Sequence, residues 1–197
     1  MSRLEKVKAY INEVPDTGKP YHNKTHWFEV YKAALKIAEH ESLPEKVKDV
    51  LGAAALFHDI KPDEREAADY ANKVLSNLGY TSQEIEVIKN LILATMGWKD
   101  PKYKPKSLLE KIICDADLAN LGSSWDEFWD ANIRLQHEFG IDKNNRSQYV
   151  SWLKSTYALL NNSYFTEGAK ILFGNREKNA AKLKEIIDKI EEDGNNI

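Results

Sequence analysis

The chain has 197 residues, and its 28 Lys and Arg nearly balance its 31 Asp and Glu, for a net charge of −3. This balance excludes a protein that binds nucleic acid or an anionic membrane by charge alone, and the longest apolar run, Leu51–Phe57, is far shorter than the ~20 residues of a membrane span. A single cysteine excludes an internal disulfide and a cysteine zinc cluster. We therefore expect a cytoplasmic globular protein with neither a membrane nor a stable nucleic-acid partner.

Apolar residues recur at three- and four-residue spacing along nearly the whole chain, which predicts helices. The predicted helices, in chain order, cover 4–14, 27–37, 47–60, 62–79 and 81–96, then one from 107, one over 124–140, and two or three more towards the C-terminus. No alternating run is bounded by Asn-Gly or Asp-Gly turns, so a sheet is not expected. The sequence predicts one all-α domain over residues 1–197. Its chemistry-bearing motifs lie at about 20–135, and we expect the helices of 143–193 to pack on this core.

The first group of candidate metal ligands is His22 and His26, in Tyr21-His-Asn-Lys-Thr-His26. Residues four apart share a face of a helix, so one face could present both imidazoles. However, His22 falls where the helix is entered, which weakens this geometry. An ordinary pair of polar residues near a helix cap explains the spacing equally well.

The second group is His58-Asp59, which closes the strongly apolar segment 51–60. A helix that is apolar on most sides is buried, and a buried imidazole beside a carboxylate needs partners. A core histidine satisfied by hydrogen bonds is the ordinary alternative. An Asp at a helix C-terminus is unfavourably placed in the helix dipole, and this favours a metal ligand. Imidazole with carboxylate suits Mn, Fe, Co, Ni or Zn, and Mg less well.

The third group is Asp115 and Asp117, which interrupt an otherwise apolar helix. They lie about 200° apart on a regular helix, so we do not expect both to face one ion. The periodicity does not choose between them. A buried carboxylate needs a cation nearby, and an Arg or Lys would satisfy it as well as a metal.

The order His, His-Asp, Asp on three separate helices resembles the HD-domain metal-dependent phosphohydrolases, and more narrowly the predicted metal-dependent HD superfamily phosphohydrolases. The motifs that carry the resemblance are Tyr21-His-Asn-x-x-His26, Phe57-His-Asp59, Leu91-Ile-Leu-Ala-Thr95, Asp115-Ala-Asp-Leu-Ala-Asn-Leu-Gly122 and Ile133-Arg134. The resemblance implies an HD-type helical bundle with a metal site between its central helices. The ligands that it implies are His26, His58, Asp59 and Asp117. Asp115 then becomes a supporting carboxylate, and His22 touches a substrate phosphate or orients His26.

The family resemblance and the histidine count together predict one divalent ion of undetermined identity, because no histidine occurs between 59 and 136. We expect hydrolysis of a phosphate ester or anhydride in a small, nucleotide-like substrate by metal-activated water. The candidates for the general acid or base are Glu64 first and Asp115 second. The candidates for binding the anionic substrate are Lys61, Arg65 and Arg134, in addition to His22, although such a cation is more often simply a solvated surface charge.

Two other functions compete with hydrolysis. A non-catalytic or very slow HD domain would bind metal and sense a nucleotide without cleaving it. A di-iron oxygenase on the same scaffold would need more His and Asp ligands than the chain has between 59 and 115. The charged segment 182–193 places isoleucines on one face, which suits a docking helix or a homodimer contact.

Overall fold

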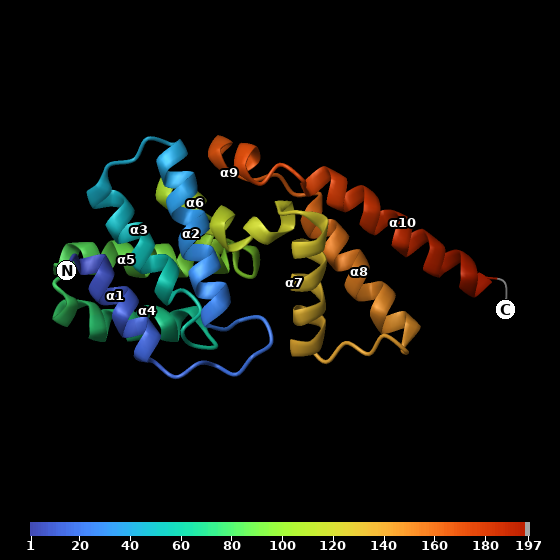
Figure 1. Cartoon of the computed structure of the whole chain (residues 1–197), viewed down its shortest axis with the longest axis horizontal. Coiled ribbons are helices and arrows are strands. Elements are labelled where there is room, and N and C mark those ends of the chain that lie inside the picture. The colour runs from blue at the N-terminus through green and yellow to red at the C-terminus, as the bar shows by residue number, and fades with distance from the viewer. Residues whose placement is uncertain (196–197) are drawn as a thin grey trace.

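The computed structural model describes residues 1–195, with residues 98 and 193–195 described by their backbone alone. Within this range the chain is all-α, without a strand, as the sequence predicts (Figure 1). The helices are α1 Arg3–Glu13, α2 Lys24–His40, α3 Glu45–Phe57, α4 Glu64–Leu75, α5 Ser82–Ala94, α6 Leu108–Asp117, α7 Trp125–Glu138, α8 Arg146–Leu160, α9 Glu167–Leu172 and α10 Arg176–Asn195. The 3-10 turns are η1 Ser76–Leu78, η2 Thr95–Trp98, η3 Pro101–Tyr103 and η4 Ala119–Gly122.

Three of these helices begin with a capping box, in which a hydroxyl and a glutamate three residues later satisfy free N–H groups of the first turn. A box of Thr81 and Glu84 opens α5. Equivalent boxes at Ser107 and Ser124 open α6 and α7. The starts predicted at 81, 107 and 124 are therefore confirmed.

The helix predicted over 47–60 ends three residues early, at Phe57. The His58 ring donates a hydrogen bond from Nδ1 to the carbonyl of Ala55 at 2.8 Å. Such a bond satisfies a carbonyl that the ending helix leaves free, and Pro62 disfavours helix just beyond. As a result, His58 and Asp59 lie in the turn after α3 and not within a helix.

The buried apolar side chains form two clusters. The first joins α1 to α6 and includes Tyr164 and Ala169 from the C-terminal part. The second is built mainly from α7, α8 and α10, and Leu118 packs against both clusters. Figure 1 shows the same arrangement, with α1–α6 gathered at the N-terminal end and α9 returning beside α2. Among the described residues, no helix combines the length and the apolar character of a membrane span.

A close backbone contact fixes how the chain returns from α9 to α10. At Gly122 in η4, a Cβ atom would lie 1.9 Å from the carbonyl oxygen of Phe173. Real side chains do not approach so closely, so only glycine lets the segment after α9 run against η4. This contact places residues 172–175 beside α2 and α6, where they form part of the groove described below.

Candidate metal centre

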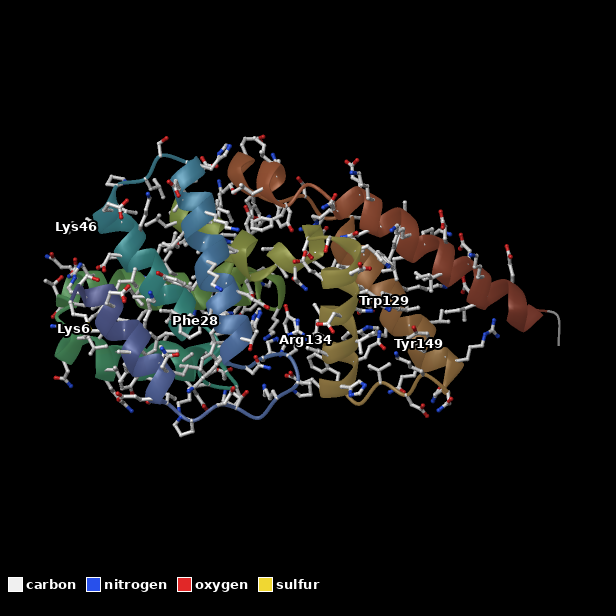
Figure 2. All side chains as sticks on the ribbon, in the orientation of Figure 1. Lys6, Phe28, Lys46, Trp129, Arg134 and Tyr149 are labelled. Carbon is white, nitrogen blue, oxygen red and sulfur yellow. The ribbon has the colours of Figure 1, made fainter. Side chains whose placement is uncertain are left out.

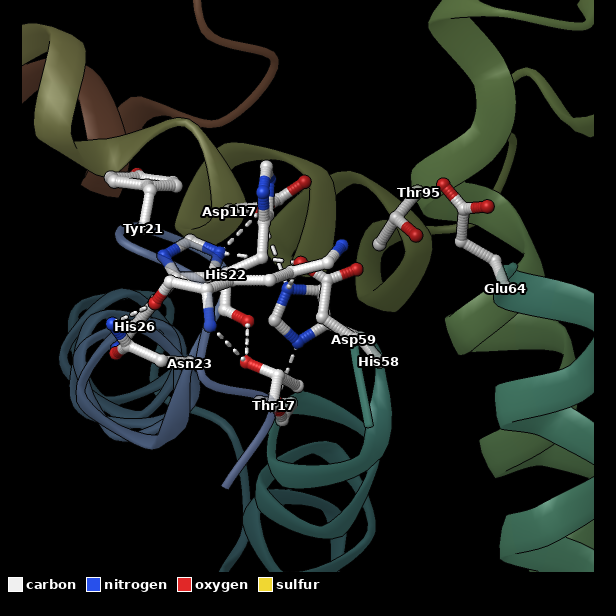
Figure 3. Close-up of polar contacts among 12 residues, drawn as sticks. Thr17, Tyr21, His22, Asn23, His26, His58, Asp59, Glu64, Thr95 and Asp117 are labelled. Carbon is white, nitrogen blue, oxygen red and sulfur yellow. Dashed lines mark hydrogen bonds and ion pairs between the residues drawn. The ribbon is translucent and has the colours of Figure 1, made fainter. Parts of the chain in front are cut away.

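Four side chains from three parts of the chain meet at one point. His26 comes from the first turn of α2, His58 and Asp59 follow α3, and Asp117 is the last residue of α6. One potential ligand atom from each lies within 4.8 Å of the others, and Figure 3 shows the four side chains converging. The structure thus brings together the four residues that the resemblance implies as ligands. We call them the ligand tetrad.

Local capping places both imidazoles of the tetrad. The side chain of Asn23 accepts hydrogen bonds from the N–H groups of Thr25 and His26, which starts α2 just before the buried His26. His58 is fully buried, and its Nδ1 donates to the Ala55 carbonyl. Because Nδ1 donates to this carbonyl, Nε2 is the ring atom of His58 that faces the tetrad, and it can offer its lone pair to a metal once it gives up its proton.

The Nε2 atoms of the tetrad lack hydrogen-bond partners. That of His26 lies 3.3 Å from Asp117 and 3.5 Å from Asp59, and that of His58 lies 3.3 Å and 3.2 Å from the same carboxylates. Both nitrogens are buried without a hydrogen bond. Leaving such an atom unsatisfied costs about 1–3 kcal/mol, which a shared divalent cation would offset. Two imidazole nitrogens and two carboxylates fit Mn, Fe, Co, Ni or Zn better than Mg.

The tetrad is strongly coupled electrostatically. Burial opposes protonation of His58, but the carboxylates of Asp59 and Asp117 outweigh it and raise the pKa of His58 well above its ordinary value. They raise the pKa of His26 in the same direction. Burial would raise the pKa of both Asp59 and Asp117, yet the two imidazoles hold each well below its usual range. The carboxylates are therefore ionised at neutral pH, as metal ligands must be.

Asp115 lies on the other side of α6, in keeping with its 200° separation from Asp117. Its carboxylate accepts hydrogen bonds from the N–H groups of Phe165 and Thr166, at 2.9 and 2.8 Å, and from the Thr166 hydroxyl at 2.7 Å. These contacts tie α6 to the start of α9. The structure does not bring Asp115 to the tetrad, and its contacts are those of the supporting carboxylate that the resemblance implies, not of a general base.

Replacing Asp115 with asparagine should therefore destabilise the fold and leave metal binding intact. An amide NH₂ placed against the donors of residues 165 and 166 leaves buried groups unpaired, so we expect a loss of about 1–3 kcal/mol in the free energy of unfolding. Urea unfolding measures this loss. Unchanged stability, or loss of metal, would contradict the supporting role.

Three predicted site residues, Glu64, Lys61 and Arg65, contact other partners instead of the tetrad. Glu64 pairs with Lys99 at 2.7 Å, and Figure 3 shows it near Thr95, apart from the tetrad. Lys61 lies over the Tyr70 ring at 4.4 Å. Arg65 is more than half exposed and pairs with Asp63 and Asp100 at 3.6 and 3.7 Å. Their predicted roles in catalysis and substrate binding receive no support from these contacts.

A groove of about 620 Å³ opens beside the tetrad, and His26 and Asp117 form part of its wall. Arg134 is the one predicted substrate-binding cation that lines it, and Figure 2 shows Arg134 on the side of α7 that faces α2. It pairs with Asp130 at 2.9 Å. Lys32 and Lys36 also line the groove, and neither has an ion-pair partner within the described part of the chain. These two lysines were not predicted from the sequence, although they follow His26 on the same helix.

The structure also places His22 and gives it a partner that the sequence analysis missed. His22 precedes α2, and its Nδ1 lies 2.7 Å from a carboxylate oxygen of Glu138, the last residue of α7. Its ring centroid is 5.6 Å from that of His26. The two partners are 116 residues apart in the chain, and no local sequence signal links them.

Comparison with known proteins agrees with this geometry. The family model described as HD domain matches residues 23–119, which contain all four tetrad residues. The fold resembles the crystal structure of a predicted HD superfamily hydrolase from an uncultured Thermotogales bacterium, with a TM-score of 0.53 and 20% identity over 97% of this chain and 90% of that one. At this identity the likeness concerns the fold alone. No curated protein matches the chain. Together, the matched region and the converging His, His-Asp and Asp show that the chain contains an HD domain.

Proposed function

We propose that the chain is a hydrolase that uses one divalent ion to cleave a phosphate ester or anhydride in a small, nucleotide-like molecule. The observation that carries the proposal is the ligand tetrad. Its two buried Nε2 atoms lack hydrogen bonds, and two of its members, His26 and Asp117, line a groove. The structural neighbour is a predicted hydrolase, which supports the proposal. The proposed partner is a phosphorylated small molecule, without a stable nucleic-acid complex.

In this proposal His26, His58, Asp59 and Asp117 hold the ion. When bound, a divalent ion polarises a phosphoryl oxygen and makes water a better nucleophile. Overall, a bond forms between the water oxygen and phosphorus, the bond to the leaving oxygen breaks, and a proton passes to the leaving oxygen. The Ala55 carbonyl keeps the His58 ring oriented for this task.

The rest of the substrate would lie in the groove, whose volume is in the range of small-molecule sites. Arg134 lies 5.4 Å from the centre of the Tyr21 ring and is tied to Asp130, so its guanidinium has a defined position. Lys32 and Lys36 are exposed and can turn towards an anionic substrate without breaking an ion pair. We propose that these three cations, not Lys61 or Arg65, bind the substrate anion.

Replacing both Lys32 and Lys36 with glutamine should raise KM for an anionic substrate by about fivefold while leaving kcat unchanged, since exposed charge pairs are each worth less than ~1 kcal/mol. The effect should shrink as salt is added, because exposed charges are screened. Steady-state kinetics at low and high salt measure it. Lys46→Gln is the matched control, since Lys46 is exposed on α3 and does not line the groove. Equal KM values for wild type and the double variant would contradict the assignment.

The proposed activity is tested with metal-free protein resupplied with Mn²⁺ or Co²⁺, by measuring inorganic phosphate and by separating the nucleotide products chromatographically. A panel of nucleoside monoesters, cyclic diesters and pyrophosphate compounds separates the bond types. We expect product formation that depends on added metal and disappears with a chelator. No product from any substrate, with metal bound, would contradict the proposal.

That negative result would favour the second candidate function, a metal-binding domain that senses a nucleotide. One observation favours it: Glu64 is paired with Lys99 and Asp115 with the start of α9, so neither predicted acid or base reaches the tetrad. The sensing function predicts nucleotide binding without turnover, which isothermal titration calorimetry of the metal-loaded protein detects.

A further inference from the structure

The side chain of Glu138 binds the segment that leads into α2. One carboxylate oxygen accepts hydrogen bonds from the N–H groups of Tyr21 and His22, at 3.1 and 3.0 Å. The other lies 2.7 Å from Nδ1 of His22 and 3.4 Å from Nζ of Lys19. The Glu138 side chain is 9% exposed. A nearly buried carboxylate with three hydrogen bonds to one short segment fixes both the backbone and the ring of His22.

The charge of Glu138 decides which nitrogen of His22 is left free. Burial would raise the pKa of Glu138, but the N–H groups and the His22 ring outweigh it and lower the pKa to about 2. The carboxylate is therefore ionised at neutral pH and can only accept hydrogen bonds. It follows that Nδ1 of His22 carries the hydrogen that Glu138 accepts, and that Nε2 of His22 is the nitrogen left free to contact another group. No hydrogen-bond partner of this Nε2 occurs among the described residues.

Aromatic neighbours hold the same ring at the edge of the tetrad. The His22 ring stands nearly perpendicular to the rings of His26, Tyr21 and Phe139, with centroids 5.6, 5.0 and 6.4 Å away. The His22 side chain is 28% exposed. It is thus open to solvent on one side and beside a tetrad ligand on another, which is where a bound substrate would reach it.

We infer that Glu138 is a positioning residue, which acts by holding His22 so that Nε2 of His22 contacts the phosphoryl group of the substrate. The inference rests on the proposed function, since it assigns a role in that reaction. It adds Glu138, a residue of α7, to the site. Both His22 and Glu138 lie outside the region 23–119 that the family model matches. The helix α7, which packs in the second apolar cluster, thus brings Glu138 to His22 at the edge of the tetrad.

A double-mutant cycle tests this coupling. His22→Ala and Glu138→Ala should each lower kcat by about 10–100-fold, the usual effect of losing a residue that orients a site, with bound metal unchanged. The double variant should be no slower than the slower single variant, because Glu138 acts through His22. Glu138→Gln keeps an oxygen for the backbone N–H groups and should lose less than Glu138→Ala. Lys143→Ala, the control, removes an exposed lysine of the loop after α7 that forms no ion pair with Glu138 and should stay within about twofold of wild type.

Several results would overturn the inference. If the two losses multiply, or if Glu138→Ala retains wild-type kcat, Glu138 does not act through His22. Thermal unfolding of each variant must accompany the kinetics. A loss of kcat in Glu138→Ala that Glu138→Gln does not relieve at all, together with a fall in unfolding temperature, would make Glu138 merely structural and would likewise overturn the inference.

A second readout is independent of activity. Long-range ¹H–¹⁵N spectra of the metal-free protein show which ring nitrogen carries hydrogen, and the His22→Ala spectrum assigns the signal. In the neutral form of the ring, we expect hydrogen on Nδ1 of His22 in wild type and loss of this preference in Glu138→Ala. Hydrogen on Nε2 in wild type would refute the contact itself. The expected spectra without phosphate release from any substrate would instead overturn the proposed function, and with it the role in catalysis.

Discussion

Replacing Asp117 with asparagine is expected to abolish metal binding and to lower phosphate release by roughly 10³-fold, because the ion supplies several kcal/mol of transition-state stabilisation. Asparagine has almost the same shape as aspartate but no negative charge. The two imidazoles would then share the charge of Asp59 alone. Metal analysis of the purified variant and its steady-state kinetics measure both effects.

Asp115→Asn is the matched control, since it makes the same chemical change two residues away on the same helix. It should bind metal as wild type does and lose only stability. The two variants thus separate a ligand from a supporting carboxylate. Metal retained in Asp117→Asn, or lost in Asp115→Asn, would contradict the assignment of Asp117 as the ligand.

The second large effect is a pH-dependent stabilisation by metal, which follows from the pKa shifts of the metal-free tetrad. His58 and His26 have raised pKa values, so their contribution to stability is full below the unfolded value of about 6.5 and is lost as the pH rises through the raised pKa. Asp59 and Asp117 have lowered pKa values, so their contribution is present above about 3.9 and is lost as the pH falls through the lowered pKa. The metal-free protein should therefore gain most from the tetrad between these two values.

A metal ion competes with protons for the same imidazoles, so its stabilising effect should grow as the pH rises. Thermal unfolding with and without Mn²⁺ measures this, at about pH 5.5 and about pH 8.5 on either side of the ordinary histidine pKa. We expect a clearly larger rise in unfolding temperature at the higher pH. An equal or smaller rise there would mean that the ion does not displace protons from the tetrad.

The fold was largely accessible from the sequence because the signals for helices are local. Apolar spacing predicted the helix starts at 81, 107 and 124, where the structure shows capping boxes that act within one helical turn. The end of α3 was misplaced because it depends on a side chain folding back, with His58 bonding the Ala55 carbonyl. Apolar spacing does not encode such a contact.

The ligand tetrad could also be predicted, for a related reason. His26, His58, Asp59 and Asp117 are polar residues in apolar segments, and this mismatch is visible in the sequence. Spacing alone showed only that Asp115 and Asp117 face different ways. The choice of Asp117 came from the family resemblance, and the hydrogen bonds of Asp115 now give a physical reason for it.

The residues around the tetrad could not be predicted, because their roles depend on distant partners. Lys61 and Arg65 looked suitable through proximity to Asp59 in the chain, yet the structure directs them to Tyr70 and to surface carboxylates. Glu138 ends α7, and nothing in its local sequence indicates the contact with His22. Contacts between residues more than a hundred positions apart in the chain depend on how whole helices pack.

The most direct test of the metal centre is a titration of the metal-free protein with Co²⁺, followed by its visible absorption. We predict saturation at one equivalent in wild type, a far weaker response in Asp117→Asn, and phosphate release that rises in step with the absorption. Wild-type protein that takes up no Co²⁺, or that takes it up equally well without the Asp117 carboxylate, would contradict the metal centre described above.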